Sequence, residues 1–465
     1  MGENTPKTGL SYLQMLGDVL LLNGATLLIY YLRGHGEVLI ANVEIYALYF
    51  FVVSLWGILL FNFFGLYHTR NKIWADIMSS LIVSIVILTV VIIVLDYMIV
   101  VYSLPRGTVI SSAVLQLGFL SVWRWVLLQW ERKFSPKRKI LIIAPAWEAG
   151  ILERKVQDSF DCLQGVIVDS AEEAEQGGLK VLGTYGDIDA LCMGDKFSNI
   201  LISGILPEDV KSKIARMSLK NGWKVFLLPN LYEIMVSHSR LNQFKDTPVF
   251  EIGPNTNPGK EQIKRGLDYI VAVIGLIITL PITLLTVLAI KLTSPGPVLY
   301  VQERVGRKGK LFMLYKFRTM VENAEGNTGP VLAAANDPRI TRVGRMLRAT
   351  RIDEIPQLLN VLKGDMSIVG PRPERPVFVE QFEKEIPGYS YRHLMKAGIT
   401  GLAQVAGNYS TSAEDKLRYD LLYTSGSSPL VDLQIMLQTI KVLMIKDKSL
   451  SLQREIMLDN FCIMY

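Results

Sequence analysis

The sequence predicts a chain of three parts: a membrane α-helical bundle of four spans, an α/β module with a Rossmann-like sheet, and an α/β domain with a re-entrant membrane helix. The 465 residues are too many for one ordinary domain. Half of them are hydrophobic and the mean hydropathy is +0.29, which is high for a wholly soluble chain. Strand-like and helix-like segments alternate in the middle. We place the three parts at residues 1–134, 135–262 and 263–465.

Four apolar stretches occupy the N-terminal part, and each is close to the ~20 residues that a helix needs to cross a bilayer. They are Tyr12–Leu32, Ile40–Phe64, Ile77–Val101 and Thr108–Gln129. No small-residue cleavage site follows the first stretch, which argues against a signal peptide. Long buried helices of a soluble core are the alternative, and four such stretches in succession argue against it.

Basic residues are distributed unevenly on the two sides of these stretches. Only Arg33 and Arg106 fall on one side. The other side carries Lys7, Arg70, Lys72, Arg132, Lys133, Lys137, Arg138 and Lys139. Because Lys and Arg are in excess on cytoplasmic flanks, both ends of the bundle are predicted to be cytoplasmic.

Short apolar segments that resemble buried strands recur in the middle part. They are Lys139–Ala144, Gly165–Asp169, Asn199–Ser203 and Lys224–Leu228. Helical segments between them favour a parallel, Rossmann-like sheet. A dinucleotide site would need G-x-G-x-x-G after the first strand, and the sequence there is A-P-A-W-E-A-G. We therefore expect a regulatory or dimerising module.

A fifth apolar stretch, Leu267–Ile290, opens the C-terminal part. Pro281 lies near its middle, where a proline removes a backbone hydrogen bond and kinks a helix. We predict a re-entrant helix over residues 264–291 that enters and leaves the membrane on the cytoplasmic face. A straight fifth span is the alternative, and it would place the rest of the chain on the opposite face.

Composition and charge exclude several classes of function. Cys162, Cys192 and Cys462 are too widely spaced for a C-x-x-C site, and the four histidines form no H-E-x-x-H pattern. These spacings argue against structural zinc and a disulfide framework. Residues 291–375 carry 15 Lys/Arg against 8 Asp/Glu, although the whole chain is only +6. Such a segment beside apolar sequence favours anionic lipids or phosphates, and no nucleic-acid-binding motif accompanies it.

Asp353 and Glu354 are the strongest candidates for chemistry. They precede Pro356 and Gly364, which suit the first turn and the end of a helix. The acids should therefore lie at a helix N-terminus, where anions are favoured. One carboxylate can attack phosphorus to give an acyl phosphate, and a neighbour can hold Mg²⁺ on a diphosphate. The alternative is a pair that only complements the helix dipole.

Arginines recur at every third residue before these acids, at Arg342, Arg345, Arg348 and Arg351. On a helix this spacing produces a slowly rotating stripe. The stripe either holds a diphosphate or faces solvent and lipid headgroups. Arg348 lies nearer the acids than Arg342 and Arg345, so it is the strongest of these three candidates for phosphate binding.

Other basic residues stand in stiff or strand-like segments. Arg372 lies between two prolines in G-P-R-P, and proline restricts both itself and the residue before it. Lys316 and Arg318 alternate with apolar residues, so a strand would place them on one face. Arg304 precedes them in Q-x-R-x-G. Each is a candidate for binding phosphate, with ordinary surface charge as the alternative.

Together these motifs closely resemble the bacterial sugar transferases called polyprenyl-phosphate hexose-1-phosphate transferases, or monotopic phosphoglycosyl transferases. The motifs are Lys264-Arg265-x-x-Asp268, Ser294–Pro297, Tyr315–Met320, Asp337–Arg339, Arg348–Arg375, Pro387–Tyr389, Gly398–Val405 and Asp415–Asp420. They cover essentially all of the C-terminal part. The order of the three parts resembles the long subfamily that initiates exopolysaccharide and capsule synthesis.

The resemblance implies transfer of a sugar 1-phosphate from a UDP-sugar to undecaprenyl phosphate, with release of UMP, at the cytoplasmic face of a bacterial inner membrane. It implies Asp353 as the nucleophile of a covalent phosphosugar intermediate, with Glu354 supporting Mg²⁺ beside it. Further positions align with functional residues of the family: Arg348, Arg372, Asp420 and either Lys316 or Arg318. It leaves the sugar and the polysaccharide pathway open. Membrane lipids, a homodimer and polysaccharide-assembly proteins are further expected partners.

Two other functions compete with this interpretation. A non-catalytic membrane scaffold or sensor of polysaccharide assembly would use the middle module to bind a regulator, and the intact acidic pair argues against it. A membrane-tethered NAD-dependent sugar epimerase or dehydratase would need the missing glycines after the first strand. It would also need a Tyr-x-x-x-Lys pattern, which does not follow the start of the module.

Overall fold

The computed structural model describes residues 5–33, 43–67, 74–98, 106–134, 139–157, 162–176, 178–191, 197, 199–237, 239–252, 258–322, 324, 337–407 and 411–444. The chain divides into two compact units, Met1–Leu227 and Leu228–Ser449. Several predicted positions lie outside the described residues: Ile40, Val101, Arg70, Lys72, Lys137, Arg138, Cys192 and Cys462.

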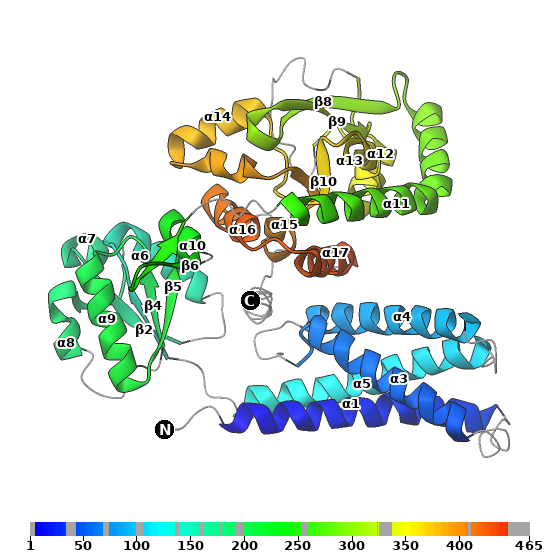
Figure 1. Ribbon diagram of the computed structural model, residues 1–465, viewed down its shortest axis with the longest axis horizontal. Helices are drawn as coiled ribbons and strands as arrows, with labels where there is room; N and C mark the ends of the chain where they lie inside the picture. Colours follow the sequence, from blue (N-terminus) through cyan, green and yellow to red (C-terminus); the bar gives the residue numbers. More distant parts are fainter. Residues whose placement is uncertain are drawn as a thin grey trace. The chain divides into compact units, whose positions relative to one another are not determined.

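Four apolar helices form the N-terminal bundle (Figure 1). They are α1 (Thr5–Leu32), α3 (Val43–Phe63), α4 (Trp74–Met98) and α5 (Arg106–Phe134). Helices α1 and α4 each pack against both α3 and α5, which closes the bundle. By length and composition α1, α4 and α5 could cross a membrane, and α3 contributes a shorter apolar stretch, Ala47–Phe63. The predicted apolar helices are therefore present, and they support membrane association.

A buried ion pair joins α1 to α5 inside this bundle. A guanidinium nitrogen of Arg124 lies 2.5 Å from Oδ2 of Asp18, and neither side chain is more than 1% exposed. Arg124 also donates a hydrogen bond to the carbonyl of Leu66. Charges in an apolar bundle are costly unless they are paired, so this contact fixes the two helices to each other.

A five-stranded sheet follows the bundle in the first unit, in the order β3-β2-β1-β4-β5. The strands are β1 (Lys139–Ile143), β2 (Cys162–Val168), β3 (Val181–Thr184), β4 (Asn199–Ser203) and β5 (Lys224–Leu228). Its helices are α6 (Ala146–Gln157), α7 (Ala171–Gln176), η1 (Tyr185–Asp187), α8 (Ile188–Leu191) and α9 (Glu208–Asn221). Pairing is parallel between β1 and β2, β1 and β4, and β2 and β3.

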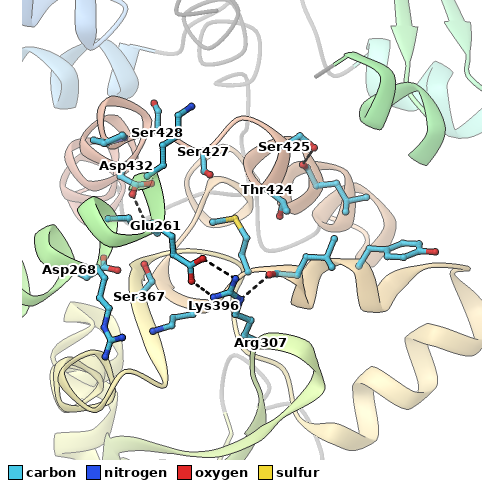
Figure 2. A pocket seen from close by; sticks show the side chains of 18 of the residues that line it. Glu261, Asp268, Arg307, Ser367, Lys396, Thr424, Ser425, Ser427, Ser428 and Asp432 are labelled. Atoms are coloured by element: carbon cyan, nitrogen blue, oxygen red, sulfur yellow. Dashed lines mark hydrogen bonds and ion pairs between the residues drawn. The ribbon is translucent and has the colours of Figure 1, made fainter. Parts of the chain in front are cut away.

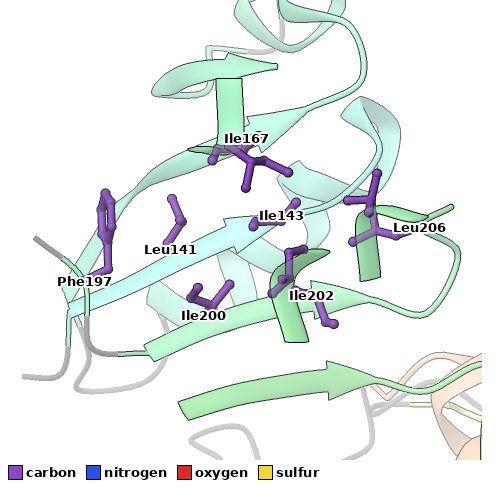
Figure 3. Packing of buried hydrophobic residues seen from close by; sticks show 10 residues of the cluster. Leu141, Ile143, Ile167, Phe197, Ile200, Ile202 and Leu206 are labelled. Carbon is purple, nitrogen blue, oxygen red and sulfur yellow. The ribbon is translucent and has the colours of Figure 1, made fainter. Parts of the chain in front are cut away.

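The apolar strands predicted from sequence form the core of this sheet. Leu141, Ile143, Ile167 and Ile202 pack together with residues of α9 (Figure 3). The predicted strands are present, and β2 begins earlier than expected. The prediction that Lys224–Leu228 is buried was wrong, because β5 forms an edge of the sheet and most of its side chains are exposed. Strand β3 is an addition that the sequence analysis missed, because its four residues are only half-buried and form no continuous apolar run.

The second unit begins with α10 (Leu231–Ser237) and a hairpin of β6 (Arg240–Phe244) and β7 (Thr247–Glu251). Its remaining helices are α11 (Pro258–Thr293), η2 (Arg307–Gly309), α12 (Arg342–Thr350), η3 (Ile352–Glu354), α13 (Gln357–Lys363), α14 (Pro376–Glu385), η4 (Tyr389–Leu394), α15 (Leu402–Ala406), α16 (Ala413–Ser425) and α17 (Pro429–Met444). Strands β8 (Leu299–Val305) and β9 (Leu311–Phe317) pair antiparallel, and β10 (Met366–Val369) and β11 (Ala397–Thr400) pair parallel. Ile234 of α10 packs with Tyr389, Leu417 and Leu421, so α10 is part of this unit.

Helix α11 contains the predicted break proline, Pro281, and remains helical through it. Figure 1 shows α11 bent part way along its length, and a proline inside a helix is an established cause of such a bend. Both ends of α11 contact the same unit. Asp268 accepts a hydrogen bond from the amide of Ile368 in β10, 3.0 Å away. Ile290, near the other end, packs with Phe317 and Leu347.

Candidate active site

The predicted acids lie in a short turn between two helices. Arg351 ends α12 with φ +58°, a left-handed conformation that a residue with a Cβ rarely adopts. This reversal leads into η3, which carries Asp353 and Glu354. Ile352 and Ile355 on either side pack into the apolar cluster around Phe317 and Leu347. The acids were predicted at a helix N-terminus, and they occupy the 3₁₀ turn immediately before α13.

Gly344 allows α12 to approach the chain after β9 closely. A Cβ on Gly344 would lie 2.0 Å from the carbonyl oxygen of Thr319, so no other residue fits without a shift of the backbone. Thr341 caps the helix by accepting a hydrogen bond from the amide of Gly344. The approach also lets Arg348 donate from Nε to Oγ1 of Thr319, at 2.8 Å.

Glu354 is the carboxylate that the surrounding cations neutralise. Its Oε1 lies 3.0 Å from Nζ of Lys316, 3.0 Å from Arg372 and 3.6 Å from Arg351. Burial acts to raise the pKa of Glu354, but Arg372, Lys316 and Arg351 outweigh it and hold the pKa well below the usual range. Glu354 is therefore ionised at neutral pH.

Asp353 differs from its neighbour, although both side chains are buried. Its Oδ1 is buried and has no hydrogen-bond partner among the described residues. Burial raises the pKa of Asp353, and Glu354 adds to the effect, while Lys316 opposes it. Glu354 is thus ion-paired with several cations, whereas Oδ1 of Asp353 accepts no hydrogen bond from the described residues.

The loop that carries Arg372 is held mainly through backbone atoms. The amide of Gly370 donates to the carbonyl of Thr400, and the amide of Gly398 donates to the carbonyl of Pro371, both at 2.9 Å. A Cβ on Gly398 would lie 2.1 Å from the amide nitrogen of Gly370. Glycine is thus required at position 398 for the backbone segments of Gly370 and Gly398 to pack this closely. This packing positions Arg372 so that its guanidinium contacts Glu354.

Two further arginines support the same loop. Arg304 donates to the carbonyl of Pro373 at 3.0 Å, and Arg392 donates to the carbonyl of Arg372 at 3.1 Å. Arg392 also forms an ion pair with Asp420 of α16, and burial raises the pKa of Asp420 to about 6 against the opposing effect of Arg392. Arg304 and Asp420 therefore support the loop of Arg372, directly in the case of Arg304 and through Arg392 in the case of Asp420.

The structure separates the predicted phosphate-binding residues into two groups. Lys316 and Arg372 contact Glu354, while Arg348 contacts Thr319 and acts on Asp353 through its charge. Arg318, predicted on the same face as Lys316, instead donates to the carbonyl and hydroxyl of Ser294 because β9 ends at Phe317. Arg318, Arg304 and Asp420 form the second group, and none of them contacts Asp353 or Glu354 directly.

Sequence reasoning missed the roles of Arg351 and Arg392. Arg351 belongs to the arginine stripe, and its position two residues before Asp353 could have predicted its contact with the acids. Arg392 offered no signal, because its contacts with Arg372 and Asp420 depend entirely on the fold.

The acidic pair suits Mg²⁺ in its chemistry. In the part of the chain that the structure describes, no three His, Cys, Asp or Glu side chains are grouped as a metal site. Mg²⁺ commonly takes only one or two carboxylates and obtains its other ligands from substrate phosphates and water. The free Oδ1 of Asp353 beside Glu354 fits that requirement.

Comparison with known proteins identifies the family of this chain. Residues 259–446 match the family model described as bacterial sugar transferase. The UDP-N-acetylgalactosamine-undecaprenyl-phosphate N-acetylgalactosaminephosphotransferase of Aeromonas hydrophila is 41% identical over 223 residues, which cover 47% of this chain and 52% of that protein.

Two other relatives are named UDP-glucose:undecaprenyl-phosphate glucose-1-phosphate transferase. The Escherichia coli (strain K12) protein is 32% identical over 329 residues, 65% of this chain and 71% of the relative. The Caulobacter vibrioides protein is 41% identical over 228 residues, 45% of this chain and 84% of the relative. The matched residues include the whole α12–η3–α13 segment. This chain belongs to the bacterial sugar transferase family.

Proposed function

We propose that this chain transfers a sugar 1-phosphate from a UDP-sugar to undecaprenyl phosphate. The names of its relatives supply the classes of donor and acceptor. The observation that carries the proposal is the asymmetry of the acidic pair. Glu354 is surrounded by cations, while Asp353 keeps a buried oxygen without a partner. A nucleophile needs such a free oxygen, and its neighbour can remain an ion-paired anchor.

In the first half of the reaction, an oxygen of Asp353 attacks the β-phosphorus of the UDP-sugar. A bond forms between the carboxylate and this phosphorus, and the bond to the bridging oxygen breaks. UMP leaves with that oxygen, and the sugar phosphate stays on Asp353 as an acyl phosphate. Lys316, Arg348 and Arg372 lie where they can offset the charge of the diphosphate.

In the second half, a phosphate oxygen of undecaprenyl phosphate attacks the same phosphorus. The bond to Asp353 breaks, the carboxylate is restored, and undecaprenyl-diphospho-sugar forms. Asp353 and Glu354 are the residues that would hold Mg²⁺, which supplies charge neutralisation for the diphosphate when bound. Arg304 and Arg392 keep the loop of Arg372 in place through backbone carbonyls.

The contacts of α11 support a re-entrant course through the cytoplasmic leaflet. Asp268 and Ile290 both contact the second unit, although the helix between them would extend about 33 Å if straight. That length exceeds the ~30 Å hydrocarbon core of a bilayer. A bent helix whose two ends meet one domain keeps the acids on the side of the UDP-sugar.

The middle module fits a regulatory or dimerising role better than cofactor binding. Its strand order is that of doubly wound nucleotide-binding sheets, which favours a Rossmann-like assignment. The amide of Ala146, at the start of α6, donates to Oδ1 of Asp169. A carboxylate therefore occupies the place where a dinucleotide would present phosphate to the helix. This arrangement disfavours the epimerase and dehydratase alternative.

The test uses purified full-length protein, Mg²⁺ and a panel of UDP-sugars labelled on the β-phosphate, without polyprenol. We expect label on the wild-type protein from one donor and none on Asp353→Asn. Label on both proteins rules out Asp353 as the nucleophile. Absence of label, with UMP released only after undecaprenyl phosphate is added, would replace the covalent step with direct transfer. Absence of both products would favour the scaffold alternative.

A further inference from the structure

A separate pocket of about 470 Å³ lies in the second unit. The first turns of α11 line it together with η4, the end of α16 and the start of α17. Figure 2 shows hydroxyl groups, including those of Thr424 and Ser427, facing Lys396 and Arg307 across the pocket. Its volume is typical of sites for small molecules.

The acidic residues of this pocket are already engaged. Asp432 forms an ion pair with Lys264 at 2.6 Å, and Glu261 forms one with Arg307. Asp268 accepts the amide hydrogen of Ile368 in β10. The carboxylates therefore either form ion pairs with neighbouring cations or secure α11. Among the described residues of the pocket, Arg265 and Lys396 form no ion pair with them.

Two of these cations converge at the end of α13. A Cβ on Gly364 would lie 3.7 Å from Nη2 of Arg265 and 3.9 Å from Nζ of Lys396. Within the described chain, Arg265 donates to the hydroxyl of Tyr269, and neither cation forms an ion pair, although Asp268 acts on Lys396 from a greater distance. Burial lowers the pKa of Lys396, and Arg265 adds to the effect because the two positive charges repel each other. An anion between them would relieve this repulsion.

The pocket is distinct from the acidic pair. Asp353 and Glu354 precede the first residue of α13, whereas Gly364 follows its last residue. Seven helical residues separate the two positions, about 10 Å along the axis. The side chains that line the pocket include neither acid and neither Lys316 nor Arg372.

The rest of the lining indicates an anion with an apolar body. Leu231, Leu394, Met395 and Leu421 contribute apolar surface beside the cations and hydroxyl groups. Apolar walls with a few convergent polar groups are typical of ligand sites, and paired cations select phosphate. We propose that this pocket binds a phosphate ester, with the phosphate at Arg265 and Lys396 and the organic part against the apolar lining. This ligand is additional to the substrates of the proposed reaction.

The first test is lysine acetylation of the full-length protein in neutral detergent, quantified by mass spectrometry. The probes are inorganic phosphate and dioctanoyl phosphatidic acid, with dioctanoylglycerol as the phosphate-free control. We expect a phosphate probe to slow acetylation of Lys396 and to leave that of exposed Lys310 unchanged. Protection by the lipid alone identifies a lipid headgroup as the ligand. Equal protection by inorganic phosphate identifies a soluble phosphate ester.

The second test counts bound phosphatidic acid by native mass spectrometry. We expect the double variant Arg265→Gln/Lys396→Gln to lose one bound molecule per chain, or about tenfold or more in affinity. Lys316→Gln, at the acidic pair, should keep that molecule. Loss in Lys316→Gln alone would assign the molecule to the acids and overturn the proposal. Unchanged acetylation of Lys396 with both phosphate probes also overturns it, and this wild-type measurement does not depend on folding of the double variant.

Discussion

Arg392 and Asp420 form an ion pair whose nitrogen and oxygen lie 2.7 Å apart, with neither side chain more than 4% exposed. The same nitrogen of Arg392 donates to the carbonyl of Arg372, whose guanidinium contacts Glu354. Asp420 therefore acts on the acids through two intervening arginines. A buried arginine needs a paired charge, and Asp420 provides it.

Asp420→Asn should lower the rate of covalent labelling. The substitution removes the counter-charge that holds Arg392 against the carbonyl of Arg372. The loop of Arg372 then loses its support, so labelling should fall more than the folded fraction does. The measurement is labelling rate per folded molecule, with folding followed by thermal melting. Glu414→Gln, a half-exposed carboxylate on the same helix, is the control. Unchanged labelling in Asp420→Asn would leave Arg392 with a structural role only.

Asp353→Asn and Glu354→Gln should change the melting temperature in opposite directions. The pKa of Asp353 is raised in the folded chain, so its ionised form costs stability above the unfolded pKa, and a neutral amide removes that cost. The pKa of Glu354 is lowered, so its charge contributes stability that Glu354→Gln loses, about 2 kcal/mol. Melting in detergent near pH 7 measures both. A lower melting temperature for Asp353→Asn would contradict the assigned environment of this acid.

The rate of covalent labelling should decrease as the pH falls, beginning above the range of an ordinary aspartate. The proposed attack requires Asp353 as a carboxylate, and the raised pKa of Asp353 moves the loss of that form to higher pH. Asp420, with a pKa of about 6, should contribute in the same range by releasing Arg392. Glu354 stays ionised there because its pKa is lowered. A single-turnover pH profile tests this, and a midpoint at or below 4 would contradict it.

Both ends of α11 should be accessible from one side of the membrane. Gln262→Cys and Leu292→Cys lie at exposed positions near the two ends, so an impermeant thiol reagent should label both in vesicles of one orientation only. The matched protein without these substitutions controls for its own three cysteines. Labelling of the two positions from opposite sides would establish the straight fifth span. Pro281→Ala restores a backbone donor and should weaken the bend.

Gly344→Ala should reduce labelling even though alanine favours helix formation. Its Cβ would meet the backbone of Thr319, which has to move away and take the hydroxyl that binds Arg348 with it. Gly266→Ala is the matched control, since a Cβ there meets nothing within 4 Å. Labelling rate and thermal melting together check this prediction. Equal rates for the two variants would show that the close approach of α12 is dispensable.

Much of the fold could be predicted because its signals are local. Long apolar runs predict the membrane helices, and Gly364 ends α13 with φ +87° as its position suggested. Residues 391–406 contain part of η4, β11 and α15, which the sequence analysis did not identify. Short elements of this kind depend on tertiary packing.

The candidate site was predictable in composition but not in geometry. Arg348, Arg351 and the two acids are close in sequence, so the single turn between α12 and α13 is enough to bring them together. The alternation of apolar and basic residues predicted that Lys316 and Arg318 share one face of a strand. The strand ends between them, at Phe317, so Lys316 contacts Glu354 and Arg318 contacts Ser294 instead. The indirect role of Asp420 depends on Arg392, which the chain brings to it only when folded.

The loop of Arg372 has a consequence for how such enzymes diversify. Its supports bind main-chain oxygens and nitrogens of residues 370–374, which are present whatever the side chains there may be. Side chains elsewhere around a sugar can then change during evolution without displacing the guanidinium that faces the acids. Relatives named for glucose and for N-acetylgalactosamine are in keeping with this separation. Selectivity for the sugar can evolve while the machinery for phosphate is inherited intact.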